Sequence, residues 1–392
     1  MKRVVVGLSG GVDSSVAAYL LKEQGYDVIG VFMKNWHDES VTLSSECPWI
    51  DDSNDALRVA NKLGIPFQAL DLSKEYKSRI VDYMFAEYEK GRTPNPDVLC
   101  NSEIKFDLFL KKALKLGADY VATGHYCRRV DNKDGSVSLM TGKDRNKDQS
   151  YFLCQVTQDQ LKKALFPLGN LQKPEVRKIA KEQDLITADK KDSQGLCFIG
   201  KVRLPEFLKQ KLEAKEGKVI EIPNDFPALV EHRDIPKDFS HISELTTPVH
   251  FRENDGIEVA QHQGAHFYTI GQRRGLNIGG RPNPSYVLQT DTKNNLVFSG
   301  QKHDHLGLNR CALKVNNDTI TFTNPKNRFK NNTITTVLAQ IRYRQPPQKA
   351  RILKQENTTY VLFDELQRGI ASGQFCAFYN FEDELLGAGV ID

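Results

Sequence analysis

The chain has 392 residues, which is longer than one hydrophobic core usually serves, so two or three domains are expected. Hydrophobic residues make up 39% and charged residues 27%, which excludes a disordered chain, and no apolar run approaches the ~20 residues that span a bilayer. The formal net charge of +4 excludes a uniformly basic surface, so a nucleic-acid partner would need local basic clusters.

The N-terminal half alternates apolar runs with helical patterns, which predicts a parallel sheet with helices on both faces. The predicted strands are 4–8, 26–33, 65–71 and 119–123, and the predicted helices are 14–24, 51–63, 73–90, 101–116, 157–165 and 174–184. Residues 1–3 lead directly into the first strand and leave no room for a signal peptide, so we expect a cytoplasmic protein. Seven cysteines without a C-x-x-C pair indicate free thiols rather than a disulfide framework.

The C-terminal half has a different texture. Residues 205–284 are rich in Pro, His and acidic residues, with the weakest pattern at 221–260, and we expect a small intermediate domain there. Short alternating strands follow, at 286–290, 296–299, 311–315, 334–343, 349–354, 358–363, 374–379 and 385–391, and predict a small β-barrel or sandwich. The predicted division of the chain is therefore 1–204, 205–284 and 285–392.

A glycine loop follows the first strand, with the sequence Ser9-Gly10-Gly11-Val12-Asp13-Ser14. Paired glycines let backbone N–H groups approach an anion, and the helix that follows adds a favourable dipole, so the loop can cradle phosphates. The loop has no Walker lysine to assist transfer of a terminal phosphate, which favours release of pyrophosphate. A plain turn capped by Asp13 and Ser14 is the alternative. The string resembles the pyrophosphate loop of the PP-loop, or N-type, ATP pyrophosphatase superfamily, whose members adenylate a substrate oxygen.

Two cysteines lie in segments suited to chemistry. Cys100 follows the proline-rich stretch 92–97 and stands at the expected start of a helix, where a helix N-terminus stabilises thiolate. Cys197 lies in the short, glycine-flanked stretch Ser193–Gly200. From the residues alone, a buried structural Cys100 and a helix-capping Asp97 remain open alternatives.

Several further strings resemble the tRNA-specific 2-thiouridylase family, over residues 9 to 276. They are Asn95-Pro96-Asp97, Cys100-Asn101, Thr123-Gly124-His125-Tyr126, Lys147-Asp148-Gln149-Ser150-Tyr151, Ser193–Gly200 and Phe267–Leu276. The resemblance implies an α/β, Rossmann-like PP-loop domain of the HUP type, a small central domain and a C-terminal β-barrel. Residues 221–260 depart from the pattern, because this segment is longer than the family's usual central segment.

The resemblance also implies the reaction. ATP with Mg²⁺ would adenylate the C2 oxygen of wobble uridine 34, and a persulfide on Cys197 would supply the sulfur that replaces it. Cys100 would be the nucleophile and Asp97 the acid or base. The residues implied to bind ATP are Gly7, Leu8, Ser9, Gly10, Gly11, Val12, Asp13, Ser14, Met33 and Gly124. The residues implied to bind tRNA are Asn95, Pro96, Asp97, His125, Lys147, Asp148, Gln149, Arg342, Tyr343 and Gln374.

The expected partners are the tRNAs for Lys, Glu and Gln and a cysteine desulfurase or sulfur-relay protein. We expect a monomer without a membrane partner and without a metal beyond Mg-ATP, and the sequence does not indicate an iron–sulfur cluster. Two rival functions remain. A ligase such as tRNA-isoleucine lysidine synthetase shares the phosphate loop but does not need Cys100 and Cys197. An ATP-binding regulator or RNA-binding module without turnover would need none of Asp13, Cys100 and Cys197.

Overall fold

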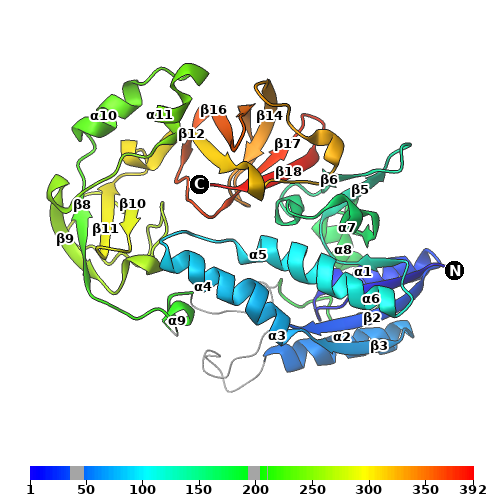
Figure 1. Ribbon diagram of the computed structural model, residues 1–392. Coiled ribbons are helices and arrows are strands. Elements are labelled where there is room, and N and C mark those ends of the chain that lie inside the picture. Colours follow the sequence, from blue (N-terminus) through cyan, green and yellow to red (C-terminus); the bar gives the residue numbers. More distant parts are fainter. Residues whose placement is uncertain (36–47, 193–203, 210) are drawn as a thin grey trace.

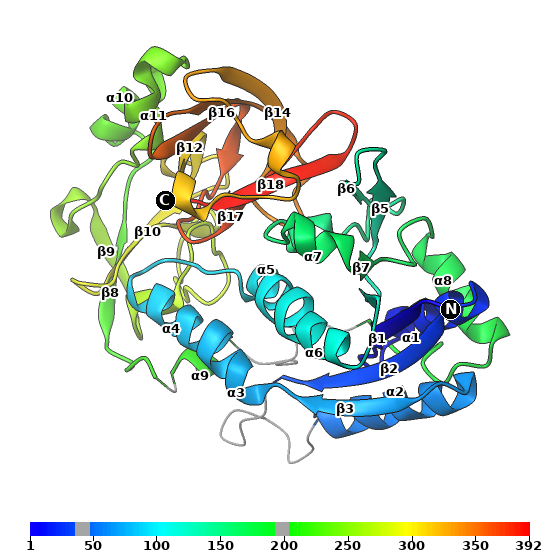
Figure 2. The same cartoon turned by 45° about the vertical axis from the view of Figure 1, so that its right-hand side comes forward.

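The computed structural model describes residues 1–35, 48–192, 204–209 and 211–392 (Figure 1). The expectations for Cys197 and its flanking stretch 193–200 fall outside these residues. Within the described residues the strands form three sheets (Figures 1 and 2).

The first sheet is parallel, as the alternation of strands and helices predicted. Its described strands run in the order β3-β2-β1-β4-β7. Their bounds are β1 Arg3–Gly7, β2 Asp27–Lys34, β3 Phe67–Asp71, β4 Tyr120–Ala122 and β7 Ala164–Leu165. Successive side chains of a strand point to opposite faces, so Val4 and Val6 pack in one core and Val5 in another. The unbroken apolar run Val4–Val6 within β1 is what a strand buried on both faces requires.

Helices cover both faces of this sheet (Figures 1 and 2). The face of Val4 and Val6 is covered by α1 Val12–Glu23, α2 Pro48–Leu63 and α8 Lys173–Glu182. The face of Val5 is covered by two longer helical runs. One run consists of α3 Ser73–Tyr76, the π-helical η1 Lys77–Val81 and α4 Asp82–Glu89; the other consists of α5 Pro96–Leu99, the π-helical η2 Cys100–Phe109 and α6 Leu110–Lys115.

The second of these runs begins earlier than predicted. Pro96 takes the first helical turn, where its fixed φ fits and its missing N–H costs nothing, and Asn95 caps the helix by accepting a hydrogen bond from the Val98 N–H at 3.3 Å. Cys100 therefore lies a full turn inside the helix. The expectation that Cys100 stands at the helix start is wrong, because the cap and the proline move the start to Pro96.

A hairpin that the sequence did not indicate links the first sheet to the last one. It consists of β5 Cys127–Asp131 and β6 Val137–Thr141, which belong to the N-terminal half of the sequence. Leu139 pairs with Leu385 and Met140 with Glu384 of β18, so a strand from the N-terminal half extends the C-terminal sheet. Nearby lie the short helices η3 Ser150–Leu153 and α7 Gln158–Lys162.

The C-terminal sheet has the described order β12-β16-β15-β14-β17-β18-β6-β5, with β13 also paired to β18. The bounds are β12 Asn309–Asn316, β13 Thr321–Phe322, β14 Ile334–Gln340, β15 Gln348–Lys354, β16 Thr358–Arg368, β17 Phe375–Tyr379 and β18 Glu384–Val390. A bridge between Val315 of β12 and Ile391, the residue directly after β18, closes the sheet on itself. The interior is apolar and includes Val337, Ile352 and Phe378.

The central sheet has the described order β10-β11-β8-β9, in which β11 and β8 are parallel. The bounds are β8 Gly217–Glu221, β9 Ile257–His262, β10 Ser285–Asp291 and β11 Leu296–Gln301. The strands expected at 286–290 and 296–299 are therefore present, but they belong to this sheet and not to the C-terminal one. The long segment 221–260 contains α10 Pro227–Asp234 and α11 Ile242–Thr246, and Ile242 and Leu245 pack against the barrel.

The other short helices are α9 Leu204–Leu208, Phe239–His241, Glu253–Asp255, Ala265–Phe267, Leu306–Leu308, Asn317–Thr319 and Pro325–Asn327.

Candidate active site

The glycine loop leaves β1 and enters α1 in a conformation that only glycine adopts readily. Gly10 has φ +72°, and a Cβ there would lie 2.2 Å from the Asp52 carbonyl oxygen. Gly11 is the N-cap of α1, and within the described residues no side chain caps this helix end. The Ser14 and Ser15 hydroxyls instead donate to the Gly11 carbonyl, at 3.1 and 2.8 Å. Among the described residues the first-turn N–H groups of α1 thus have no side-chain cap, which contradicts the alternative of a turn capped by Asp13 and Ser14.

The expected ATP-binding residues surround this loop. A Cβ on Gly124 would lie 2.8 Å from the Asp13 carbonyl carbon and the Ser14 nitrogen, so the end of β4 approaches the loop backbone closely. A Cβ on Gly7 would lie 3.1 Å from Cε of the buried Met33. A side chain at Gly7, Gly10 or Gly124 would crowd the loop. The uncapped N-terminus of α1 suits the charge of a phosphate chain. The residues present therefore fit ATP.

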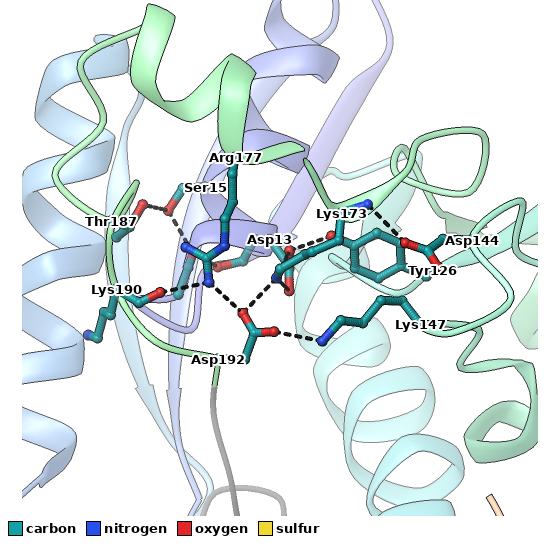
Figure 3. A network of polar contacts seen from close by, with 12 residues as sticks. Asp13, Ser15, Tyr126, Asp144, Lys147, Lys173, Arg177, Thr187, Lys190 and Asp192 are labelled. Carbon is teal, nitrogen blue, oxygen red and sulfur yellow. Dashed lines mark hydrogen bonds and ion pairs between the residues drawn. The ribbon is translucent and has the colours of Figure 1, made fainter. Parts of the chain in front are cut away.

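A charged network lies beside the loop, as Figure 3 shows. Asp13, in the first turn of α1, accepts a hydrogen bond from the Tyr126 hydroxyl at 2.7 Å. The ammonium of Lys173, at the start of α8, lies 2.7 and 2.8 Å from the two Asp13 carboxylate oxygens. Burial and the negative charge of Asp13 raise the pKa of Tyr126, so this hydroxyl stays a donor.

Asp192 lies at the other side of the same network (Figure 3). Among the described residues three cations reach its carboxylate: Lys147 at 2.7 Å, Lys173 at 2.8 Å and Arg177 at 2.9 Å. Burial alone would raise the pKa of Asp192, but hydrogen bonds from Lys147 and Lys173 outweigh it and lower the pKa to about 2. The hydrogen bond to Asp192 raises the pKa of Lys147 in turn.

Sequence reasoning missed Lys173, Arg177 and Asp192, and it quoted Tyr126 without giving it a role. One signal was present. Lys173 precedes the proline that opens a predicted helix, and in a parallel α/β sheet such connections meet beside the first glycine loop. Spacing alone could not show that a lysine 160 positions away faces Asp13.

The turn that carries the expected catalytic residues lies on the opposite face of the sheet from α1. Pro96 and Cys100 are buried, and Asp97 is half-buried. Cys100 belongs to the same hydrophobic core as Val5 and Met33, so it packs on the face of the sheet opposite α1. His125 is also buried: its ring contacts Phe106 and Phe166, and burial lowers its pKa well below the ordinary value, so it is neutral.

The same turn is fastened to the C-terminal barrel. The Gln374 side-chain amide donates to the Thr93 and Pro94 carbonyls at 2.9 and 3.2 Å, and it accepts from the Asn95 side chain at 3.3 Å. The Thr93 N–H donates to the Ser372 carbonyl at 2.8 Å. Gly373, with φ +90°, lies so close that a Cβ would be 3.0 Å from the Thr93 backbone. Residues some 280 positions apart thus hold each other in place.

The other expected tRNA-binding residues make internal contacts in this structure. The Arg342 guanidinium donates to the Gly369 and Ile270 carbonyls. The Tyr343 ring lies 4.3 Å from that of Phe152. Asp148 accepts from the Gly142 and Ser150 N–H groups, and Gln149 pairs with the backbone of Tyr126. Arg342 thus joins the barrel to the segment between β9 and β10, and Tyr343 joins it to η3 of the N-terminal half.

Three models of known families match successive parts of the chain. Residues 2–201 match the tRNA methyl transferase HUP domain, residues 241–301 the tRNA methyl transferase PRC-barrel domain, and residues 311–391 the aminomethyltransferase beta-barrel domain. In the part of the chain that the structure describes, every helix is too short or too polar to traverse a lipid bilayer.

Full-length relatives carry a more specific name. The chain is 59% identical over 396 residues to a tRNA-specific 2-thiouridylase MnmA from Christiangramia forsetii, with 100% of each chain covered. It is 46% identical to a protein of the same name from Karelsulcia muelleri, over 100% of this chain and 98% of the relative. A solved NMN synthetase from Francisella tularensis aligns at 18% identity over 50% of this chain and 69% of its own, with a TM-score of 0.31. The loop, the cysteine-bearing turn and this full-length identity agree, and the chain belongs to the tRNA-specific 2-thiouridylase family.

Proposed function

We propose that this protein is a sulfurtransferase that converts a uridine of tRNA to 2-thiouridine at the expense of ATP. The observation that carries the proposal is the open phosphate loop, whose helix end is uncapped within the described residues and whose close glycine contacts suit a nucleotide. Family membership supplies the substrate class, since the full-length relatives are named for tRNA 2-thiolation.

The first step activates the base. The C2 oxygen of uridine forms a bond to the α-phosphorus of ATP, the bond from that phosphorus to the bridging oxygen breaks, and pyrophosphate departs with the electron pair. The N3 proton of uridine is lost to a base, for which we propose Asp97. Residues Gly7 to Ser14, with Met33 and Gly124, would hold ATP, and Asp13 would hold its Mg²⁺.

The second step delivers sulfur. The terminal sulfur of a persulfide on Cys197 attacks C2, and the C2–O bond breaks so that AMP leaves with the oxygen. The Cys100 thiolate then attacks the inner sulfur of Cys197, and the electron pair of the broken S–S bond stays on the sulfur bound to C2. The product is 2-thiouridine, and the Cys100–Cys197 disulfide needs a thiol reductant. A cysteine desulfurase or sulfur-relay protein would reload Cys197.

For the RNA we propose wobble uridine 34 of the tRNAs for Lys, Glu and Gln, bound at the junction of the three sheets. Asn95, Pro96, Asp97 and His125 would meet the base, and Lys147, Asp148, Gln149, Arg342, Tyr343 and Gln374 would contact the anticodon arm. We also propose a monomer. Because β11 pairs with β8 and β10 pairs with β11, we propose a domain boundary after residue 301 rather than at 284.

Methyl transfer, which the names of two domain models mention, is not favoured. A phosphate loop of this type serves cleavage of ATP between its α- and β-phosphates, and methyl transfer needs no such step. A lysidine-type ligase would share the loop but would have no use for the persulfide chemistry of Cys100 and Cys197.

The function is tested by incubating unmodified tRNA with the protein, ATP, cysteine and a cysteine desulfurase, followed by mass analysis of the nucleosides. We expect 2-thiouridine, with AMP and pyrophosphate released.

Cys100→Ser should make no 2-thiouridine yet should still accept one sulfur on the Cys197 peptide, because the thiol that releases this sulfur is missing. Cys197→Ser should accept no productive sulfur but should still release pyrophosphate slowly. Normal thiolation by Cys100→Ser would contradict its role, and Cys154→Ser is the control, since Cys154 is a buried packing residue.

A further inference from the structure

A cavity lies where the central sheet, the long segment 221–260 and the barrel come together. Its volume is about 180 Å³. The lining is largely apolar and includes Leu229 of α10, Phe251, Leu288 of β10 and Ile370 of the barrel. An apolar cavity of roughly 150 Å³ accepts benzene, so this one has room for a ligand built on a single ring.

One side chain with a permanent charge contributes to this lining. Arg310, on β12, donates from its guanidinium to the Thr246 and Ile370 carbonyls, at 3.3 and 3.5 Å. Both hydrogen bonds are long, and they leave most of the five guanidinium N–H groups to other acceptors. Among the described residues no carboxylate forms an ion pair with Arg310, and those that line the cavity include neither Asp nor Glu.

The charge of Arg310 persists at neutral pH. Burial lowers the pKa of Arg310 to about 10, which leaves the guanidinium protonated. A charge withdrawn from water without an opposite charge nearby costs free energy, and an anionic ligand would recover part of that cost.

A second polar group lines the same cavity from α10. The Nε2 atom of His232 is buried and has no hydrogen-bond partner within the described part of the chain. Burial and the nearby charge of Arg310 lower the pKa of His232, so its ring is neutral and Arg310 supplies the positive charge. The cavity thus combines one cation, one unpaired neutral nitrogen and apolar walls.

We propose that this cavity binds a small organic acid, whose carboxylate accepts hydrogen bonds from Arg310 and whose ring or branched body packs against the apolar walls. One guanidinium matches a single negative charge, and its planar fork fits the two oxygens of a carboxylate. The Nε2 atom of His232 offers a contact to a polar substituent of the ligand. A bare inorganic anion would gain nothing from the apolar walls.

The cavity also borders the turn that carries the proposed catalytic residues. Thr93 and Ser372 both line it, and the Thr93 N–H donates to the Ser372 carbonyl at 2.8 Å. A ligand in the cavity would contact both sides of this link, so its binding should stabilise the attachment of the turn to the barrel. The residues of the phosphate loop do not line this cavity, so the site is distinct from the one proposed for ATP.

Titration of the full-length protein with sodium benzoate, followed by calorimetry and by thermal unfolding, tests the proposal. Benzoate should bind and raise the Tm. Benzyl alcohol, which has a similar ring but no charge, should bind at least about tenfold more weakly, and Arg310→Met should weaken benzoate binding about 10–100-fold. Arg351→Met is the matched control, since this second barrel arginine lies over the Phe239 ring, 5.6 Å from its centroid, and its loss should leave benzoate affinity unchanged.

A second variant keeps the test decisive if Arg310→Met does not fold. Val249→Phe adds a ring to the cavity wall and leaves Arg310 in place, so benzoate should lose its site. Failure of the parent to bind benzoate, or equal benzoate affinity in the parent and in the variants that fold, would overturn the proposal. Inorganic phosphate that binds through Arg310 more tightly than benzoate would also overturn it, because the site would then serve phosphate groups rather than an organic acid.

Discussion

The phosphate loop and the turn at Thr93–Cys100 are held by different kinds of contact. The loop is held by its own glycine backbone and by a network of charges, in which Lys173 links Asp13 to Asp192. The turn is held by neutral amides and by close packing against Gly373 of the barrel. Charged contacts respond to pH and to bound anions, whereas neutral hydrogen bonds and packing do not. The site therefore combines one region that can respond to its ligand with one that is fixed by the fold.

The largest effect should come from removing the carboxylate at the loop. We expect Asp13→Ala to lower tRNA-dependent release of pyrophosphate at least about a hundredfold, because the loop loses the group proposed to hold Mg²⁺ and Lys173 loses its partner. The protein should stay folded by circular dichroism. Asp27→Ala, which breaks the Arg3–Asp27 ion pair of 2.6 Å elsewhere on the sheet, should retain activity. Full activity in Asp13→Ala would show that the Asp13 carboxylate is not needed for cleavage of ATP.

An intermediate effect should follow from adding a methyl group to the fixed region. Gly373→Ala should lower the free energy of unfolding by about 1–3 kcal/mol more than Gly135→Ala does. Both glycines have positive φ, at +90° and +76°, but a Cβ on Gly135 meets nothing within 4 Å in the described structure. Urea denaturation measures the difference. Thiolation should fall in Gly373→Ala while Mg-ATP affinity is unchanged, and a parallel loss of ATP binding would mean that the two regions are not independent.

The smallest effect should be a difference in pH dependence. The pKa of Asp192 falls from 3.8 to about 2 on folding, so its contribution to stability is complete above the unfolded value and is lost as the pH falls towards 2. The stability lost in Asp192→Asn should therefore shrink between pH 5 and pH 2. The loss in Gln374→Ala, which removes only neutral hydrogen bonds, should stay constant over that range. Denaturation curves at several pH values compare the two, and identical pH profiles would contradict the comparison.

The two regions also differ in how far the sequence reveals them. The loop is local: a strand, two glycines and a helix follow one another, and the alternation of apolar runs predicted the parallel sheet. The contacts across the chain could not be predicted. Nothing in the sequence 127–141 indicates that a hairpin there will pair with β18. The sequence around Gln374 likewise does not show whether this side chain contacts Thr93 or RNA. Local sequence motifs determine short-range geometry, whereas tertiary packing determines which distant segments pair with each other.

The contact between Gln374 and Asn95 has a consequence for the way the enzyme is made. The two residues are 279 positions apart, and β6 likewise waits for β18, near the C-terminus, to complete its pairing. At a synthesis rate of ~5–20 residues per second, roughly 15–55 s separate the emergence of the turn from that of its partner. A nascent chain can form the parallel sheet and the phosphate loop during that interval, but the cysteine-bearing turn has no barrel to rest on. We expect incomplete chains to bind ATP without transferring sulfur. Sulfur transfer would begin only after the C-terminal barrel has been synthesised and has folded.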